Sequence, residues 1–115
     1  MLCCLLKAKL HNARITHVEP NYEGSLTIDQ DLMDAVKLLP YEKILVANAR
    51  NGKRFETYAI PGPRGSGKIA LNGPACHQGR VGDRVVVFGF CFVDAKKAAR
   101  HRPRVLVLDA RNRPV

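Results

Sequence analysis

The most constraining feature of this chain is an Asn–Gly pair set between two strand-like segments. Residues 43–49 and 53–60 are rich in aliphatic and aromatic side chains, and Arg50-Asn51-Gly52 separates them. Asparagine and glycine tolerate the positive φ angles that tight hairpin turns require, so the pair predicts an antiparallel hairpin. A chain with such a hairpin near its middle has to build a sheet around it.

Strand-like segments and turn residues alternate along the rest of the 115 residues. Asp29 is typical of a helix N-cap and Pro40 of a helix stop, and the apolar residues between them follow helical spacing, so we predict one helix there. Short strands at this density, with one or two short helices, predict a mainly β fold and a small β-barrel, formed by a single domain of residues 1–115. Further strands are predicted over 2–6, 13–19, 68–71, 84–93 and 105–109, a loop over 61–67, a turn over 72–75 and a short helix over 96–101.

Composition narrows the class of protein. The chain is 46% hydrophobic and 25% charged, which excludes intrinsic disorder. Its apolar runs are shorter than a signal peptide core or the roughly 20 residues of a membrane helix, so we expect a cytoplasmic protein with no membrane partner. The four cysteines, Cys3, Cys4, Cys76 and Cys91, lack metal-ligand spacing, so we expect thiols and no metal.

The net charge of +9 favours anionic partners, and residues 94–115 alone contribute +5 from seven basic and two acidic residues. Phe88, Phe90 and Phe92 lie at period two in the strand-like run 84–93, an arrangement that also occurs in RNA-binding strands. A basic β-barrel module that binds nucleic acid is therefore an alternative function. We interpret the three phenylalanines as core-facing, because residues at period two share one face of a strand.

Residues 62–68 match the spacing of a nucleotide-binding P-loop, but Ile69 stands where a magnesium-binding Ser or Thr is needed. Pro74 follows too soon for the long helix that should open behind such a loop. We therefore interpret the segment as a glycine-rich loop.

The Gly24-Ser25 pair is the candidate for covalent chemistry. A serine hydroxyl can attack the preceding peptide carbonyl when the peptide is held under strain, and glycine tolerates such strain best. Around this pair, and over about residues 7–93, the chain resembles the aspartate 1-decarboxylase family. The motifs that carry the resemblance are Lys9-Leu10-His11, Thr16-His17, Tyr22-Glu23-Gly24-Ser25, Ile28-Asp29-Gln30-Asp31, Asn51-Gly52-Lys53-Arg54-Phe55, Thr57-Tyr58-Ala59-Ile60, Arg64-Gly65-Ser66, Asn72-Gly73 and Val81-Gly82-Asp83.

The resemblance implies a double-psi β-barrel that assembles as a homotetramer. It implies an enzyme that converts L-aspartate to β-alanine and CO₂, for pantothenate and coenzyme A synthesis, with a covalent pyruvoyl group and neither pyridoxal phosphate nor metal. The pyruvoyl carbonyl condenses with the substrate amine as a Schiff base and serves as the electron sink. The group arises from Ser25 when the chain cuts itself into a β chain, 1–24, and an α chain, 25–115. A maturation factor is a further implied partner.

The resemblance also assigns roles to individual residues. Thr57 assists the cleavage and contacts substrate, Asn72 orders the site, and Tyr58 donates a proton during decarboxylation. Lys9 and Arg54 bind the substrate carboxylates, and Arg54 presents the planar guanidinium suited to that contact. Substrate contacts are also implied for Gly73, Pro74 and Ala75, although Pro74 lacks an N–H donor, and supporting positions for His11 and Tyr22.

Overall fold

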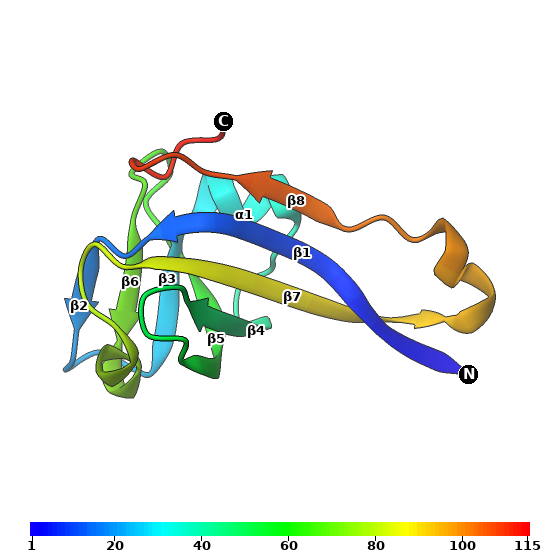
Figure 1. Ribbon diagram of the computed structural model, residues 1–115, viewed down its shortest axis with the longest axis horizontal. Coiled ribbons are helices and arrows are strands. Elements are labelled where there is room, and N and C mark those ends of the chain that lie inside the picture. The colour runs from blue at the N-terminus through cyan, green and yellow to red at the C-terminus, as the bar shows by residue number, and fades with distance from the viewer.

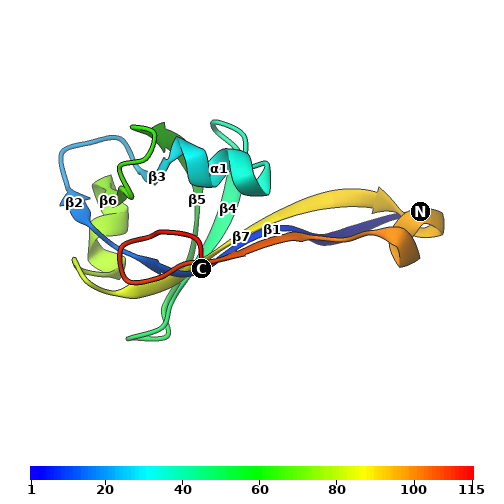
Figure 2. The same ribbon diagram turned by 90° about the horizontal axis from the view of Figure 1, so that it is seen from above.

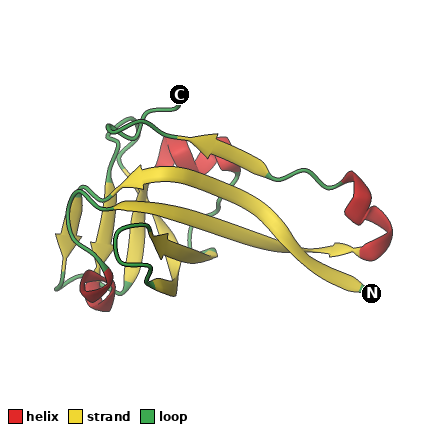
Figure 3. Cartoon of the chain, in the orientation of Figure 1, coloured by secondary structure: helices red, strands yellow, loops and turns green.

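The structure of the chain, a computed structural model, describes residues 1–115 and consists mostly of strands with three short helical segments (Figures 1 and 3). In chain order the elements are β1 (Leu2–Arg14), β2 (His17–Glu19), β3 (Ser25–Asp29), α1 (Gln30–Val36), β4 (Lys43–Asn48), β5 (Arg54–Gly62), β6 (Ile69–Asn72), the 3₁₀ helix η1 (Gly73–Gln78), β7 (Arg84–Asp94), the 3₁₀ helix η2 (Ala95–Arg100) and β8 (Arg104–Val107). The predicted mainly β fold is confirmed.

The strands form one sheet of eight, in the order β2-β6-β3-β5-β4-β7-β1-β8. β4 and β5 are the antiparallel hairpin predicted from Asn51-Gly52, and Gly52 has a φ of +73°. β2, at one end of the sheet order, follows β1 after only two residues, and β1 lies near the other end. The two ends of the sheet are therefore close together in space. There Thr16 N–H donates to the Ile69 carbonyl (2.8 Å) and Ile15 N–H to that of Asp83 (3.0 Å). The sheet therefore curls back on itself, consistent with a small double-psi β-barrel.

The interior is filled by aliphatic side chains from most strands of the curled sheet and from α1. Leu32, Met33 and Val36 form the buried face of α1, and the Asp29 carboxylate caps the helix by accepting from Asp31 N–H (2.9 Å). The helix ends before Pro40, because Lys37 takes a left-handed conformation, with a φ of +59°. Large side chains that are almost completely buried are Leu10, Ile15, Leu26, Ile28, Met33, Val36, Ile44, Val46, Ile69, Leu71, Val85 and Val87.

Several predicted boundaries are wrong. The strand predicted over 2–6 continues to Arg14, because β1 pairs with β7 along its length and absorbs two register shifts as bulges. The strand predicted over 13–19 is instead the end of β1 and the short β2. The loop predicted from residue 61 begins later, because β5 continues through Pro61 in a parallel ladder with β3. The turn predicted over 72–75 is the end of β6 followed by η1.

The interpretation of the three phenylalanines as core-facing is also wrong. The core face of β7 is formed by Val85 and Val87, while Phe90 and Phe92 are 43% and 73% exposed. β7 is apolar on both faces, so periodicity alone did not identify its inner face. Beyond the barrel, β1 and β7 continue as a long two-stranded arm that ends at η2 (Figures 1 and 2), and Phe92 lies on this arm.

Candidate active site

Ser25 opens β3, the strand placed between β5 and β6 in the sheet. All five residues of β3 are buried, and Ser25 is completely so. The sequence favours this placement because Leu26, Thr27 and Ile28 are the apolar or β-branched residues that a central strand needs. A potential nucleophile is thereby held away from bulk water at a fixed position in the sheet.

The Ser25 hydroxyl is fixed by two hydrogen bonds. Its Oγ donates to the carbonyl of Glu23 (3.0 Å) and accepts from Nδ2 of Asn72 (3.0 Å). Asn72 faces Ser25 across the antiparallel ladder between β3 and β6 and is completely buried. Its Oδ1 atom has no hydrogen-bond partner. An unpaired buried acceptor costs free energy, and such costs are concentrated at functional sites.

The segment before Ser25 is pressed against the start of η1. Gly73 has a φ of +60°, and a Cβ atom there would lie 2.7 Å from the Tyr22 carbonyl oxygen and 2.9 Å from the Gly24 nitrogen. Pro74 approaches from the same side, since a Cβ on Gly24 would lie 3.4 Å from its Cδ. Glycine at position 73 is therefore required by both the left-handed backbone and the close approach.

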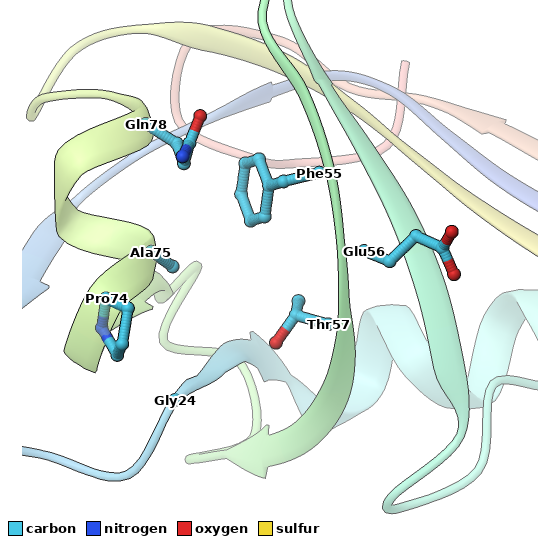
Figure 4. Close-up of a pocket in the computed structure, with 7 residues that line it drawn as sticks. All are labelled: Gly24, Phe55, Glu56, Thr57, Pro74, Ala75 and Gln78. Carbon is cyan, nitrogen blue, oxygen red and sulfur yellow. The ribbon is translucent and has the colours of Figure 1, made fainter.

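A pocket of about 280 Å³ opens beside the Gly24–Ser25 bond. In Figure 4 the Thr57 side chain projects into the pocket from β5, while that of Glu56 points away from it. Predicted residues Gly24, Thr57, Pro74 and Ala75 meet here. The pocket is lined by Gly24, Phe55, Glu56, Thr57, Pro74, Ala75 and Gln78.

The position of η1 relative to the β4–β5 hairpin is fixed by a polar cluster around Asp83, whose side chain is 4% exposed. Its carboxylate accepts from Arg50 Nε (2.6 Å), Asn48 Nδ2 (2.9 Å) and Arg80 N–H (3.0 Å). The hydrogen bond from the Arg50 guanidinium is the main reason why the pKa of Asp83 is lowered to about 2. Asn48 Nδ2 also donates to the Gln78 carbonyl (3.1 Å), so the cluster holds one wall of the pocket.

Tyr58 lies beside Ser25 in the sheet. β3 and β5 run parallel with Leu26 opposite Ala59, and Ser25 and Tyr58 are the preceding residues of the two strands. Because side chains alternate along a strand, Arg54 and Tyr58 share the face of β5 on which Glu56 lies, opposite Thr57. The Tyr58 ring packs against Tyr41, with centroids 6.0 Å apart.

Neither of the two predicted carboxylate-binding residues lines the pocket beside Gly24. Lys9 belongs to β1, four strands from β3 in the sheet order, and its Nζ lies 5.8 Å from the centre of the Phe88 ring. Arg54 is exposed and lies four residues along β5 from Tyr58, or roughly 13 Å at the usual strand rise. Both residues lie on the outer face of the sheet.

Of the remaining two predicted residues, Tyr22 lies next to the site and His11 does not line the pocket. Tyr22 is 52% exposed and approaches Gly73 through its backbone carbonyl rather than its ring. His11 is half-buried on β1, and its Nδ1 has no hydrogen-bond partner.

Four residues that build the site were not predicted from the sequence: Thr27, and the pocket-lining Phe55, Glu56 and Gln78. Thr27 accepts a hydrogen bond from Asn72 Nδ2 (2.8 Å), and Gln78 lines the pocket at the end of η1. The alternation of Ser25 and Thr27 along one strand was the only sequence signal for Thr27.

No group of three or more His, Cys, Asp or Glu side chains is arranged to hold a metal ion. No helix has the length and apolar character needed to cross a membrane.

The fold and the site define a small β-barrel protein in which a buried serine after glycine, held by an asparagine amide, is the candidate reactive group. The family model described as aspartate decarboxylase matches residues 1–115, and the chain belongs to this family.

Curated relatives named aspartate 1-decarboxylase cover nearly the whole chain. The relative from Syntrophobacter fumaroxidans is 50% identical over 111 residues, which is 96% of this chain and 90% of the relative. The relative from Shouchella clausii is 50% identical over 111 residues, with 96% and 87% covered. The relative from Heliobacterium modesticaldum is 52% identical over 107 residues, with 93% and 81% covered.

Proposed function

We propose that this protein is a self-cleaving, pyruvoyl-dependent enzyme that decarboxylates L-aspartate to β-alanine and CO₂ and so supplies pantothenate and coenzyme A synthesis in the cytoplasm. The observation that carries the proposal is the completely buried Ser25, hydrogen-bonded to Asn72 beside the pocket, in a chain that matches the family over its full length. One domain, 1–115, is then divided into a β chain, 1–24, and an α chain, 25–115.

The cleavage starts at the Ser25 hydroxyl. Its Oγ adds to the Gly24 carbonyl carbon, the C–N bond breaks, and the hydroxyl proton passes to the nitrogen, which leaves an ester with a free amine. Loss of the Ser25 Cα proton expels the Gly24 carboxylate and leaves dehydroalanine. Water then replaces the nitrogen, ammonia departs, and a ketone remains. Thr57, projecting toward this bond, is the proposed donor to the oxyanion of the first step.

The surroundings of Ser25 fit the pyruvoyl group that this cleavage would leave. Asn72 Nδ2 already donates to an oxygen at this position, and the Thr57 hydroxyl, which lines the pocket, is available as a second donor. Asn72 and Thr57 would hold the group, which supplies an electrophilic carbonyl as electron sink. The cavity of about 280 Å³ accommodates a substrate as small as aspartate.

The other residues are proposed to bind substrate and supply a proton. Arg54 and Lys9 bind the two carboxylates, and the Gly73–Ala75 segment contacts the substrate with one N–H donor fewer because of Pro74. Tyr58, next to Ser25 in the sheet and on the face of β5 opposite Thr57, is proposed to hold on its phenol oxygen the proton that the substrate carbon receives when CO₂ leaves.

We propose that the active form is a homotetramer in which Lys9 and Arg54 reach the pocket of a neighbouring subunit. Two observations support this proposal. Both cationic residues lie on the outer face of the sheet, and the arm exposes apolar side chains, including Leu2 (67%) and Phe92 (73%), that a second subunit would bury. We also propose that a separate maturation factor accelerates the cleavage.

Intact mass under denaturing conditions tests the proposal. We expect two pieces that divide at Gly24–Ser25, the larger one lighter by one ammonia than the product of hydrolysis and reactive toward a hydrazine. The Ser25→Ala variant is expected to remain one chain and to release no CO₂ from aspartate. Release of CO₂ by the Ser25→Ala protein would overturn the mechanism.

A further inference from the structure

Asn72 has one side-chain nitrogen and two hydroxyl partners, both on β3. Nδ2 donates to Ser25 Oγ at 3.0 Å and to Thr27 Oγ1 at 2.8 Å. Ser25 and Thr27 lie two residues apart on the strand, so their side chains point to the same face. Both hydrogens of the amide are thereby used, and no other group contributes, because Oδ1 has no partner. The orientation of the Asn72 amide therefore depends on these two hydroxyl groups alone.

The Thr27 side chain is itself held in one orientation. It is 7% exposed, and its methyl group packs against β5 at Gly62, where an added Cβ would lie 2.8 Å from Thr27 Cγ2. Threonine is also stiff at χ1 because it is β-branched. Its hydroxyl is consequently a fixed acceptor, whereas the Ser25 hydroxyl must change its bonding during the cleavage.

We propose that Thr27 is a positioning residue for the self-cleavage, with its hydroxyl orienting the Asn72 amide so that the second N–H meets Ser25 Oγ. The inference rests on the proposed function, since it concerns the same cleavage. The Asn72 hydrogen bond occupies one lone pair of Ser25 Oγ while the hydroxyl proton is directed to the Glu23 carbonyl. The remaining lone pair is free to attack the Gly24 carbonyl.

Loss of the Thr27 hydroxyl would leave one buried Nδ2 hydrogen without an acceptor. An unpaired buried donor is unfavourable, and rotation of the amide to bring Oδ1 toward Ser25 relieves part of that penalty. In the rotated amide, Oδ1 competes with the Glu23 carbonyl for the Ser25 hydroxyl proton. The nucleophile loses its donor and its defined orientation together.

Two pairs of variants isolate the hydroxyl. Thr27→Val keeps the shape of the wild-type side chain without the oxygen, and Thr27→Ala differs from Thr27→Ser by the same oxygen. We expect Thr27→Val to slow the cleavage about 10-fold, which corresponds to one lost hydrogen bond. Thr27→Ser should cleave within about 3-fold of wild type, and Thr27→Ala should be as slow as Thr27→Val. The rate is followed by intact mass after denatured precursor is refolded.

A double-mutant cycle separates positioning from general destabilisation. If Thr27 acts through Asn72, Thr27→Val should slow the Asn72→Ala protein no further, whereas a merely structural effect would add to it. The thermal midpoints are compared in a Ser25→Ala background, in which none of the chains cleaves.

The inference is overturned if Thr27→Val cleaves within 2-fold of wild type, if Thr27→Ser is as slow as Thr27→Ala, or if the Asn72→Ala and Thr27→Val effects add. If any of these outcomes is found while the wild-type chain still cleaves, only the role of Thr27 is overturned and the proposed function is unaffected. A wild-type chain that stays intact on prolonged warming overturns both.

Discussion

Gly73 combines a left-handed backbone with a crowded neighbourhood, and the two requirements can be separated by experiment. Gly52 has a similar φ, +73° against +60°, but no heavy atom lies within 4 Å of a Cβ placed there. Gly52→Ala should therefore cost only the left-handed conformation, about 1–2 kcal/mol of folding free energy. Gly73→Ala should cost more and slow the cleavage, because the added methyl displaces the Tyr22–Gly24 backbone.

The cleavage rate and the free energy of unfolding are measured for both variants, the latter in a Ser25→Ala background. Equal losses of stability and equal cleavage rates for the two variants would show that the contact with Tyr22 and Gly24 is unimportant.

Tyr58 belongs to the decarboxylation and not to the cleavage in the mechanism proposed. Tyr58→Phe keeps the ring that packs on Tyr41 and removes only the phenol oxygen. The variant should cleave at the wild-type rate and form β-alanine about 100-fold more slowly, the lower end of what a positioned proton donor contributes. Chromatographic assay of β-alanine, normalised to the fraction of cleaved chain, gives the comparison. An unchanged kcat would remove Tyr58 from the role of proton donor.

The sequence identified Ser25 and Asn72 through their motifs, but it did not identify Thr27. Thr27 matters only because Asn72, 45 residues further along the chain, pairs with Ser25 across β3 and β6. That pairing is a property of the sheet and leaves no local pattern. The same reasoning applies to Lys9, whose outward position on β1 depends on a strand order that residue spacing does not encode.

At the scale of elements, local signals predicted what is locally determined. The Asn51-Gly52 turn and the Asp29 cap lie where they were predicted, because each is fixed by residues within a few positions. The length of β1 and the inner face of β7 were not predicted correctly, since long-range pairing decides both. The 3₁₀ helix η1 begins at Gly73-Pro74, a pair that the sequence alone indicates as a turn.

The polar cluster around Asp83, which connects η1 to the β4–β5 hairpin, should make the stability of the protein depend on pH. The pKa of Asp83 is about 2 in the folded protein, below the ordinary value of 3.8, so the unfolded chain binds more protons between these values. The contribution of Asp83 to stability is complete above the ordinary value and is lost as the pH falls through the folded pKa. Because the Arg50 side chain is 41% exposed and solvent screens its charge, we expect the free energy of unfolding to fall by roughly 1–2 kcal/mol.

Denaturant titrations between pH 2 and 7, in a Ser25→Ala background, measure this loss. Arg50→Met removes the hydrogen bond that lowers the pKa most, so the variant should be less stable than its parent at pH 7 and nearly equal to it at pH 2. Lys43→Met is the matched control, because the Lys43–Glu56 pair is exposed on both sides and should contribute little. An Arg50→Met deficit that persists unchanged to pH 2 would contradict the role of Asp83.

At the scale of the whole molecule, the proposed homotetramer places the two cationic residues of one chain at the pocket of another. Lys9 lies on the outer face of β1 and does not line the pocket beside Gly24, so in the proposed tetramer it contacts the substrate of a neighbouring subunit. The net charge of +9 per chain adds a long-range attraction for anionic aspartate, which salt weakens. Under the proposal, the specific contact with Lys9 requires a neighbouring subunit, whereas the long-range attraction does not.

Mixed oligomers test that requirement. Ser25→Ala subunits carry Lys9 but form no pyruvoyl group, and Lys9→Ala subunits form the group but lack the cation, so each variant alone should be almost inactive. When the two are co-expressed in equal amounts, half of the subunits carry an intact Ser25. About half of those should have a neighbour with Lys9, which predicts up to a quarter of the wild-type activity. Mixing the separately purified tetramers should restore nothing until they exchange subunits. If a pocket used Lys9 of its own chain, no combination of these two variants would recover activity, because no single chain would hold both residues.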